Sequence, residues 1–211
     1  MARLINGILG GFSGKVGTVV GVIKGDACII RSLPKKRTHF TTNELENQKK
    51  MGMVQAYLNP LKDLLKVGFA NYYTKTGGFR AALAYTRREA LVSDADGNCY
   101  IDPALFKISG GVLPQAINPA MVWNDPALLI TWDITTLNYE EEADQLMVLI
   151  YDPLHKIATT RIFNGAFRRD GELKIELDPH LSTTEINVYI GFVSADRTAQ
   201  SDSQYLGKVM V

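Results

Sequence analysis

The hydrophobic pattern of the chain opens with two apolar, β-branched runs. KVGTVVGVI and ACIIRSL lie within residues 15–33 and are separated by Lys24-Gly25-Asp26. Gly25 tolerates a positive φ, so this tripeptide favours a tight turn, and the two runs predict a β-hairpin. Pro34 ends the second run because proline has no N–H to donate to a strand ladder.

A helical pattern follows the hairpin. Thr41 lies three residues before Glu44, which is the spacing of a capping box. Asn59-Pro60 interrupts this first helix, and Pro60 suits the first position of a second helix. Apolar residues at helical spacing predict that second helix: Leu61, Leu64, Leu65 and Phe69. The segment FRAALAYTRREAL, residues 79–91, predicts a third.

Beyond SDADGNCYID the pattern changes to short strands. Turn residues such as Asp152-Pro153 and Arg169-Asp170-Gly171 separate six apolar segments: 127–134, 144–152, 157–165, 171–178, 184–195 and 205–211. Short strands at regular spacing predict a β-sandwich, with Trp132 between its sheets. In this pattern residues 117–211 resemble a fibronectin type III or other immunoglobulin-like domain.

The prediction is therefore an α+β fold with two domains. Residues 1–114 would form a glycine-rich β-hairpin plus helices, and residues 117–211 an immunoglobulin-like β-sandwich. The segment from Pro114 to Pro119 is expected to link them, and we expect residues 117–211 to fold alone.

Charge is distributed unevenly along the 211 residues, although the net charge is only +1. Residues 1–90 hold fifteen Lys/Arg against five Asp/Glu, and residues 91–211 hold eight against seventeen. A basic front and an acidic back indicate either a polyanion partner or head-to-tail association between copies. Neutralisation of one half by the other within a molecule is the alternative.

The glycine-rich opening GILGGFSGKVGTVVG, residues 7–21, invites a phosphate-loop interpretation. A Walker A loop would need glycine at residue 9 and Ser or Thr after Lys15, and those positions hold Leu9 and Val16. A nucleophile elbow around Ser13 fails because Lys15 replaces its last glycine. We interpret the glycines as a device for close packing, with a self-association surface at Gly10, Gly11, Gly14, Gly17, Val19 and Gly21.

No other motif predicts a catalytic residue, a metal site or a cofactor. DADGN at 94–98 lacks the glycine and glutamate of an EF-hand at Cys99 and Leu105. Cys28 and Cys99 form neither a disulfide framework nor a zinc motif, and we expect small buried or half-buried thiols. YEEEAD is typical of a solvated loop. Loop positions are expected for the three histidines, His39, His155 and His180.

A basic connector follows the hairpin. A possible polyanion-binding group comprises Arg31, Lys35, Lys36 and Arg37, with His39 and Phe40 beside it. Phosphate backbones attract such clusters through counterion release. A solvated loop is the other interpretation.

The N-terminus MARLINGILGG does not resemble a signal peptide, because Asn6 and Gly7 break its apolar stretch and no cleavage site follows. No apolar run approaches the ~18 residues of a membrane span. The expected location is cytoplasmic or virion-associated.

Five segments carry a family resemblance: ARLINGILGGFSGKVGTVVG, IIRSLP, NQKK, LNPLKDLLKVGF and GGVLP. With them the whole chain resembles an uncharacterised bacterial family classed as a domain of unknown function. The resemblance implies no activity and supplies no catalytic residues.

These observations predict a non-enzymatic, self-associating structural protein whose partners are copies of itself. Immunoglobulin-like domains are frequent in phage virion proteins, so a virion or phage-like assembly is one version, by analogy. The alternative is a nucleic-acid-binding protein that uses residues 31–40. A third possibility is a carbohydrate-binding module or hydrolase that uses the acidic sandwich loops.

Overall fold

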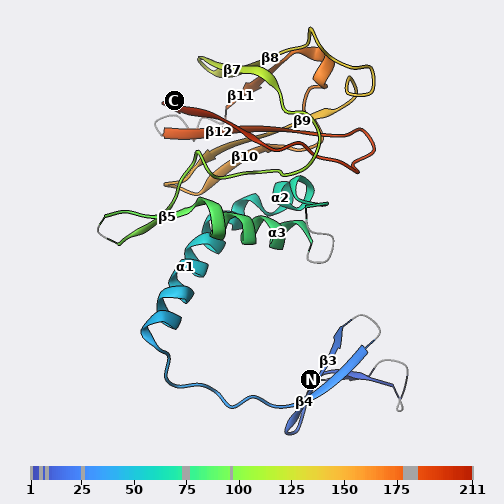
Figure 1. The fold of residues 1–211 in the computed structure, drawn as a ribbon, viewed down its shortest axis with the longest axis vertical. Coiled ribbons are helices and arrows are strands. Elements are labelled where there is room, and N and C mark those ends of the chain that lie inside the picture. Colours follow the sequence, from blue (N-terminus) through green and yellow to red (C-terminus); the bar gives the residue numbers. More distant parts are fainter. Residues whose placement is uncertain are drawn as a thin grey trace. The chain divides into compact units, whose positions relative to one another are not determined.

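A computed structural model describes residues 2–4, 7, 10–24, 27–72, 77–95, 97–177 and 185–210 (Figure 1). The chain divides into two compact units, Met1–Leu45 and Glu46–Val211, called here the N-terminal and C-terminal units. Helices and antiparallel strands make it an α+β protein, as the sequence pattern predicts. No described helix is long and apolar enough to cross a membrane.

The N-terminal unit is a four-stranded antiparallel sheet in the order β1-β2-β3-β4. Its strands are Arg3–Leu4, Phe12–Val16, Val19–Lys24 and Ala27–Ser32. The sequence pattern predicts a single extended segment over residues 15–23, and this prediction is wrong. Gly17 has a φ of +57° and turns the chain between β2 and β3. Gly25 and Asp26 of the predicted turn lie outside the described residues.

Three helical segments follow, close to the predicted ones. α1, Thr42–Leu58, begins with the predicted capping box. The Thr41 hydroxyl accepts a hydrogen bond from the Glu44 amide at 3.3 Å, and the Glu44 carboxylate accepts one from the Thr41 amide at 2.9 Å. A 3-10 turn containing Pro60, Asn59–Leu61, leads into α2, Lys62–Gly68. α3, Gly78–Tyr85, continues as a π-helical turn, Thr86–Ala90.

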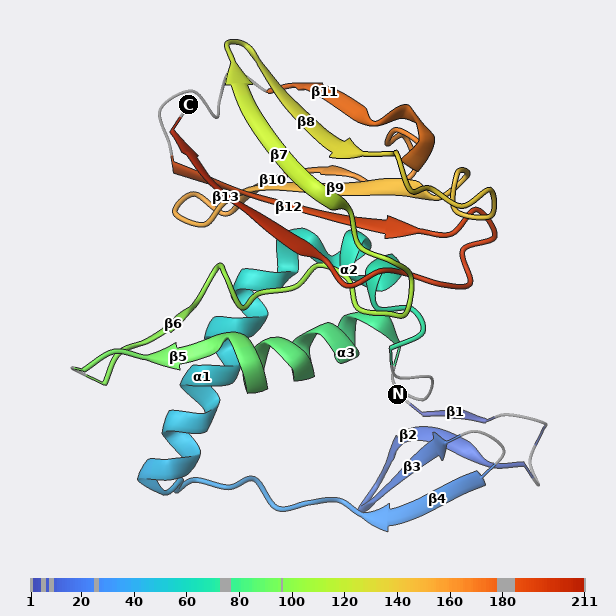
Figure 2. The same cartoon turned by 45° about the horizontal axis from the view of Figure 1, so that its top comes forward.

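The strands of the C-terminal unit form two larger sheets and one hairpin (Figure 2). One sheet has the order β10-β9-β12-β13, with strands Ile157–Arg161, Gln145–Asp152, Glu185–Val193 and Gln204–Met210. The other has the order β11-β8-β7, with strands Glu172–Glu176, Ala127–Asp133 and Ile117–Asn124. The hairpin pairs β5, Leu91–Ser93, with β6, Cys99–Ile101.

β7 is a strand that the sequence pattern misses, as are β1 and the β5–β6 hairpin. Pro119 lies inside it, and a proline inside an apolar run argues against a strand because it cannot donate to the ladder. The structure accommodates Pro119 through a register shift between Ile117 and Ala120, where Asn118 has a φ of +46°. β7 is also an edge strand, a position at which sheets tolerate proline.

The four-stranded sheet of the C-terminal unit is buried on both faces. One face packs against the three-stranded sheet through residues such as Val148 and Ile150, with Trp132 buried as predicted. The other face packs against the helices, where Leu149 and Tyr151 meet Leu58 and other helical residues. The unit is therefore three layers: helices, four-stranded sheet and three-stranded sheet.

The segment before β7, residues 107–116, which includes the start of the predicted linker, is bound to residues 200–204. The Leu113 amide donates to the Gln200 carbonyl at 2.9 Å, and the Ala116 amide donates to the Gln204 side chain at 2.9 Å. Lys107 forms an ion pair with Asp202 at 2.6 Å. The structure thus groups residues 46–211 together, whereas the sequence pattern places a boundary between residues 114 and 117.

Arg168 joins three segments of this unit from a buried position. Its guanidinium donates to Asp144 at 3.1 Å and to the Pro114 carbonyl at 2.8 Å, and it lies 3.8 Å from the centre of the Phe192 ring. The Arg168 carbonyl accepts the Trp132 indole N–H at 2.7 Å. Burial raises the pKa of Asp144, and the Arg168 charge opposes that rise.

We expect Arg168→Ala to lower the free energy of unfolding of the C-terminal unit by about 3–5 kcal/mol, because Asp144 is left charged and unpaired in the interior. Denaturant unfolding followed by tryptophan fluorescence measures it, since both tryptophans lie in this unit. The exposed neighbour variant Arg169→Ala should change it by less than about 1 kcal/mol. Equal losses in the two variants would contradict the role given to Arg168.

A comparison of two fragments tests the domain boundary. Residues 46–211 should unfold in one cooperative transition, because both faces of the four-stranded sheet stay covered. Residues 117–211 lack the helices that cover Met147, Leu149 and Tyr151, so we expect no cooperative transition. Calorimetry distinguishes the two, and a cooperative 117–211 fragment would restore the boundary predicted from the sequence.

Candidate functional site

The N-terminal sheet has two faces of different chemistry. Residues directly opposite each other on paired strands share a face. Lys15, Val20 and Arg31 are opposite one another across β2, β3 and β4. From Lys15 onward, alternation along β2, β3 and β4 then defines a basic face: Lys15, Val20, Val22, Lys24, Ala27, Ile29 and Arg31. The uncharged face holds Gly14, Val16, Val19, Gly21, Ile23, Cys28, Ile30 and Ser32.

This sheet has almost no interior. Gly21 is the one buried residue among the described residues of the N-terminal unit. Apolar side chains on both faces stay exposed: Val22 and Ile29 on the basic face, and Ile30 on the uncharged face, where the exposed fraction reaches 58%. A small sheet needs a packed hydrophobic face for independent stability, and within the N-terminal unit these apolar side chains are not packed into a core.

Two of the predicted self-association glycines serve close packing inside the unit. A Cβ at Gly21 would collide with the Phe12 carbonyl oxygen and ring, and a Cβ at Gly11 would lie 2.7 Å from the Cys28 side chain. Residues 11–12 therefore cross part of the uncharged face at these points. Cys28 itself is exposed, contrary to the expected burial, whereas Cys99 is half-buried.

The other predicted residues lie around the same sheet. Gly14 lies in β2 with a φ of +109°, and Gly17 forms the β2–β3 turn with open space around it. Gly10 lies just before β2, and Val19 is half-buried at the start of β3. The structure thus brings all six predicted residues into one unit, and their role in self-association stays a prediction.

The cations of the basic connector differ in their contacts: Arg37 is paired with an acidic residue, whereas Lys35 and Lys36 are not paired with a described one. Arg37 is held by Glu44 in a two-point ion pair, with distances of 2.9 and 3.1 Å, and its guanidinium lies 5.4 Å from the centre of the Phe40 ring. The pKa of Glu44 is lowered, first by the hydrogen bond from the Thr41 amide and then by Arg37. Lys35 and Lys36 are exposed and form no ion pair with a described carboxylate.

The structure adds two cations that the sequence analysis does not place in the polyanion group. Lys15 and Lys24 lie on the basic face with Arg31, although they are far apart in sequence. Strand alternation is the signal that reveals them, but it requires the turn at Gly17 to be known first.

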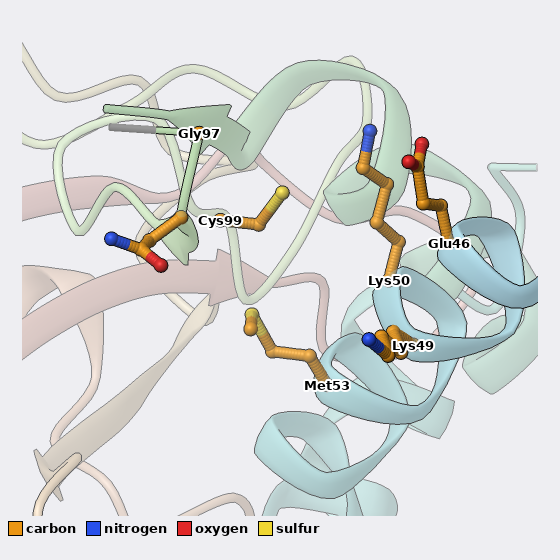
Figure 3. A pocket seen from close by; sticks show the side chains of 7 residues that line it. Glu46, Lys49, Lys50, Met53, Gly97 and Cys99 are labelled. Atoms are coloured by element: carbon orange, nitrogen blue, oxygen red, sulfur yellow. The ribbon is translucent and has the colours of Figure 1, made fainter. Parts of the chain in front are cut away.

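A separate hollow of about 410 Å³ lies in the C-terminal unit (Figure 3). One wall is α1, with Glu46, Lys49, Lys50 and Met53, and the other is the β5–β6 turn with Gly97, Asn98 and Cys99. Among the described residues, no group of three or more His, Cys, Asp or Glu side chains is placed to hold a metal ion. The Cys99 sulfur lies 3.3 Å from the Ser93 hydroxyl, a contact within the hairpin.

Fold and surface together define an α+β protein with an exposed apolar and basic N-terminal sheet. The chain belongs to a family of unknown function, DUF6266, whose model matches residues 11–207. The resemblance to a domain-of-unknown-function family is confirmed by this match. Searches of curated proteins and of solved structures found no match.

The close approach at Gly21 leads to a testable difference between two glycines. Gly21→Val should disrupt the N-terminal sheet, because the new side chain would occupy the position of the Phe12 carbonyl. Gly17→Asn should preserve it, since asparagine tolerates a positive φ and nothing lies within 4 Å. Amide NMR spectra report on each strand. Retention of the β3 and β4 signals in Gly21→Val would contradict the packing described.

Proposed function

We propose that the protein is a non-enzymatic structural component that self-associates through its N-terminal sheet. The observation that carries this proposal is the N-terminal sheet itself. Several of its branched apolar side chains are exposed, and Gly21 is the one buried residue among the described residues of the N-terminal unit. Burial of apolar surface contributes about 25 cal/mol per Å². A second copy of the chain carries the same apolar face, and contact between the two faces would supply that burial.

The distribution of charge indicates which face meets the second copy. Two basic faces brought together would oppose Lys15, Lys24 and Arg31 to the same three cations, and buried like charges repel strongly. The uncharged face has no such penalty, and sheets pack face to face at about 10 Å. Contact between two identical patches produces a closed two-fold dimer. The charge asymmetry between the halves of the chain provides for further head-to-tail contacts.

For the C-terminal unit we propose an immunoglobulin-like sandwich over residues 117–211. Its first, second and fifth strands share one sheet, and its third, fourth, sixth and seventh share the other. This division supports the fibronectin type III resemblance. A virion or phage-like assembly, with a cytoplasmic or virion-associated location, fits such a sandwich by analogy. No specific contact favours a carbohydrate-binding or hydrolytic role.

Two neighbouring substitutions on opposite faces test the proposal. Ile30→Lys places a charge on the uncharged face, and we expect the dissociation constant of the oligomer to rise tenfold or more, the equivalent of about 1.4 kcal/mol. Ile29→Lys, at a similarly exposed position of the same strand, places its charge on the basic face and should leave the constant within about threefold. Light scattering coupled to size exclusion measures both.

Deletion of residues 1–32 provides the control for the C-terminal unit. The shortened chain should remain folded, by calorimetry, and should be a monomer. A full-length protein that is monomeric at all concentrations would refute the proposal. A deletion variant that assembles like the full chain would place the interface elsewhere.

A further inference from the structure

We propose that the basic face of the N-terminal sheet and the following connector form one surface that binds the phosphate backbone of nucleic acid. Five exposed cations compose it: Lys15, Lys24, Arg31, Lys35 and Lys36. The inference goes beyond self-association, because it concerns the face that the proposed contact between copies leaves free.

The register gives the surface its shape. Lys15 and Arg31 flank Val20 on its two neighbouring strands, so their backbones are about 10 Å apart at a strand spacing of about 4.8 Å. Lys24 lies four residues beyond Val20 on β3, which is about 13 Å along the strand. β4 then ends at Ser32 and the connector continues the cation series with Lys35 and Lys36. The charges thus cover an area rather than a point.

No described acidic group neutralises these cations. The strands of the N-terminal sheet contain no Asp or Glu, and none of the five cations forms an ion pair with a described carboxylate. Several basic residues outside this surface are paired, among them Arg37 with Glu44, Lys107 with Asp202 and Lys208 with Glu185. Among the described residues, no carboxylate within ion-pair distance competes with an external anion for these five cations.

The composition of the face selects nucleic acid over an acidic protein. Protein–protein interfaces are depleted in lysine, whereas protein–nucleic acid interfaces are much more positively charged. Between the cations lie Val20, Val22 and Ile29, which offer no hydrogen bond to a base edge. Binding through this surface is therefore to phosphates and independent of base sequence.

Arg37 is excluded from the surface although it belongs to the same basic run in the sequence. Its guanidinium is committed to both oxygens of Glu44, so the local pair carries no net charge. This exclusion distinguishes the structural proposal from one based on the run of residues 31–40 alone.

The experiment measures binding of the full-length protein to a mixed-sequence 20-base-pair DNA duplex and to a single strand of the same length. Fluorescence anisotropy between 50 and 200 mM salt gives the dependence of affinity on salt. Five phosphate contacts predict a log–log slope of about −4.5 for the duplex and about −3.5 for the single strand. Lys15→Gln, Lys24→Gln and Lys35→Gln should each reduce the magnitude of the duplex slope by about 0.9.

Two matched controls remove charge from other places. The double variant Arg37→Gln/Glu44→Gln preserves net charge and should leave the slope unchanged. Lys174→Gln removes an exposed strand lysine of the C-terminal unit, and it should also have no effect. Amide NMR spectra confirm that each variant keeps the N-terminal sheet.

Three outcomes would overturn the proposal. One is a salt slope that none of the three lysine variants changes. A second is an equal loss of slope in Lys174→Gln, which would indicate only the net charge of the chain. The third is polyglutamate binding as tightly as DNA at equal charge, which would assign the face to an acidic protein instead.

Discussion

The burial of β9 on both faces is the constraint on which the C-terminal unit depends. All eight residues, Gln145–Asp152, are buried, and they alternate between the sandwich core and the core shared with the helices. Neither core is complete without this strand. The segment at 107–116 and the side chain of Arg168 contact several of these elements, and residues 46–211 group as one compact unit.

The N-terminal unit, in contrast, has no apolar core among its described residues. Its strands have the same β-branched composition as a buried strand, yet the only described residue that it buries is a glycine. Close packing at Gly21 and Gly11 fixes the path of residues 11–12 without creating an apolar core. One face of this sheet carries Lys15, Lys24 and Arg31, and the other carries no charged side chain from Gly14 onward.

Much of the fold follows from local signals. The capping box at Thr41 and Glu44 fixes the start of α1, and the apolar run of β9 is too strong to miss. β7 was missed because Pro119 opposes a strand until a bulge and an edge position are known. Both faces of the N-terminal sheet were missed for a related reason. Whether Lys15 shares a side with Arg31 depends on a turn at Gly17, and a one-residue change in register reverses every side chain.

The edge strand β4 has a consequence for the folding of this protein in the cell. It is the last strand of its sheet, with all six residues exposed, and an exposed apolar edge is a template for amyloid-like pairing. Lys24 and Arg31 lie beside the apolar runs of β3 and β4, where charged residues act as gatekeepers against aggregation. The two cations therefore oppose further strand pairing at this edge.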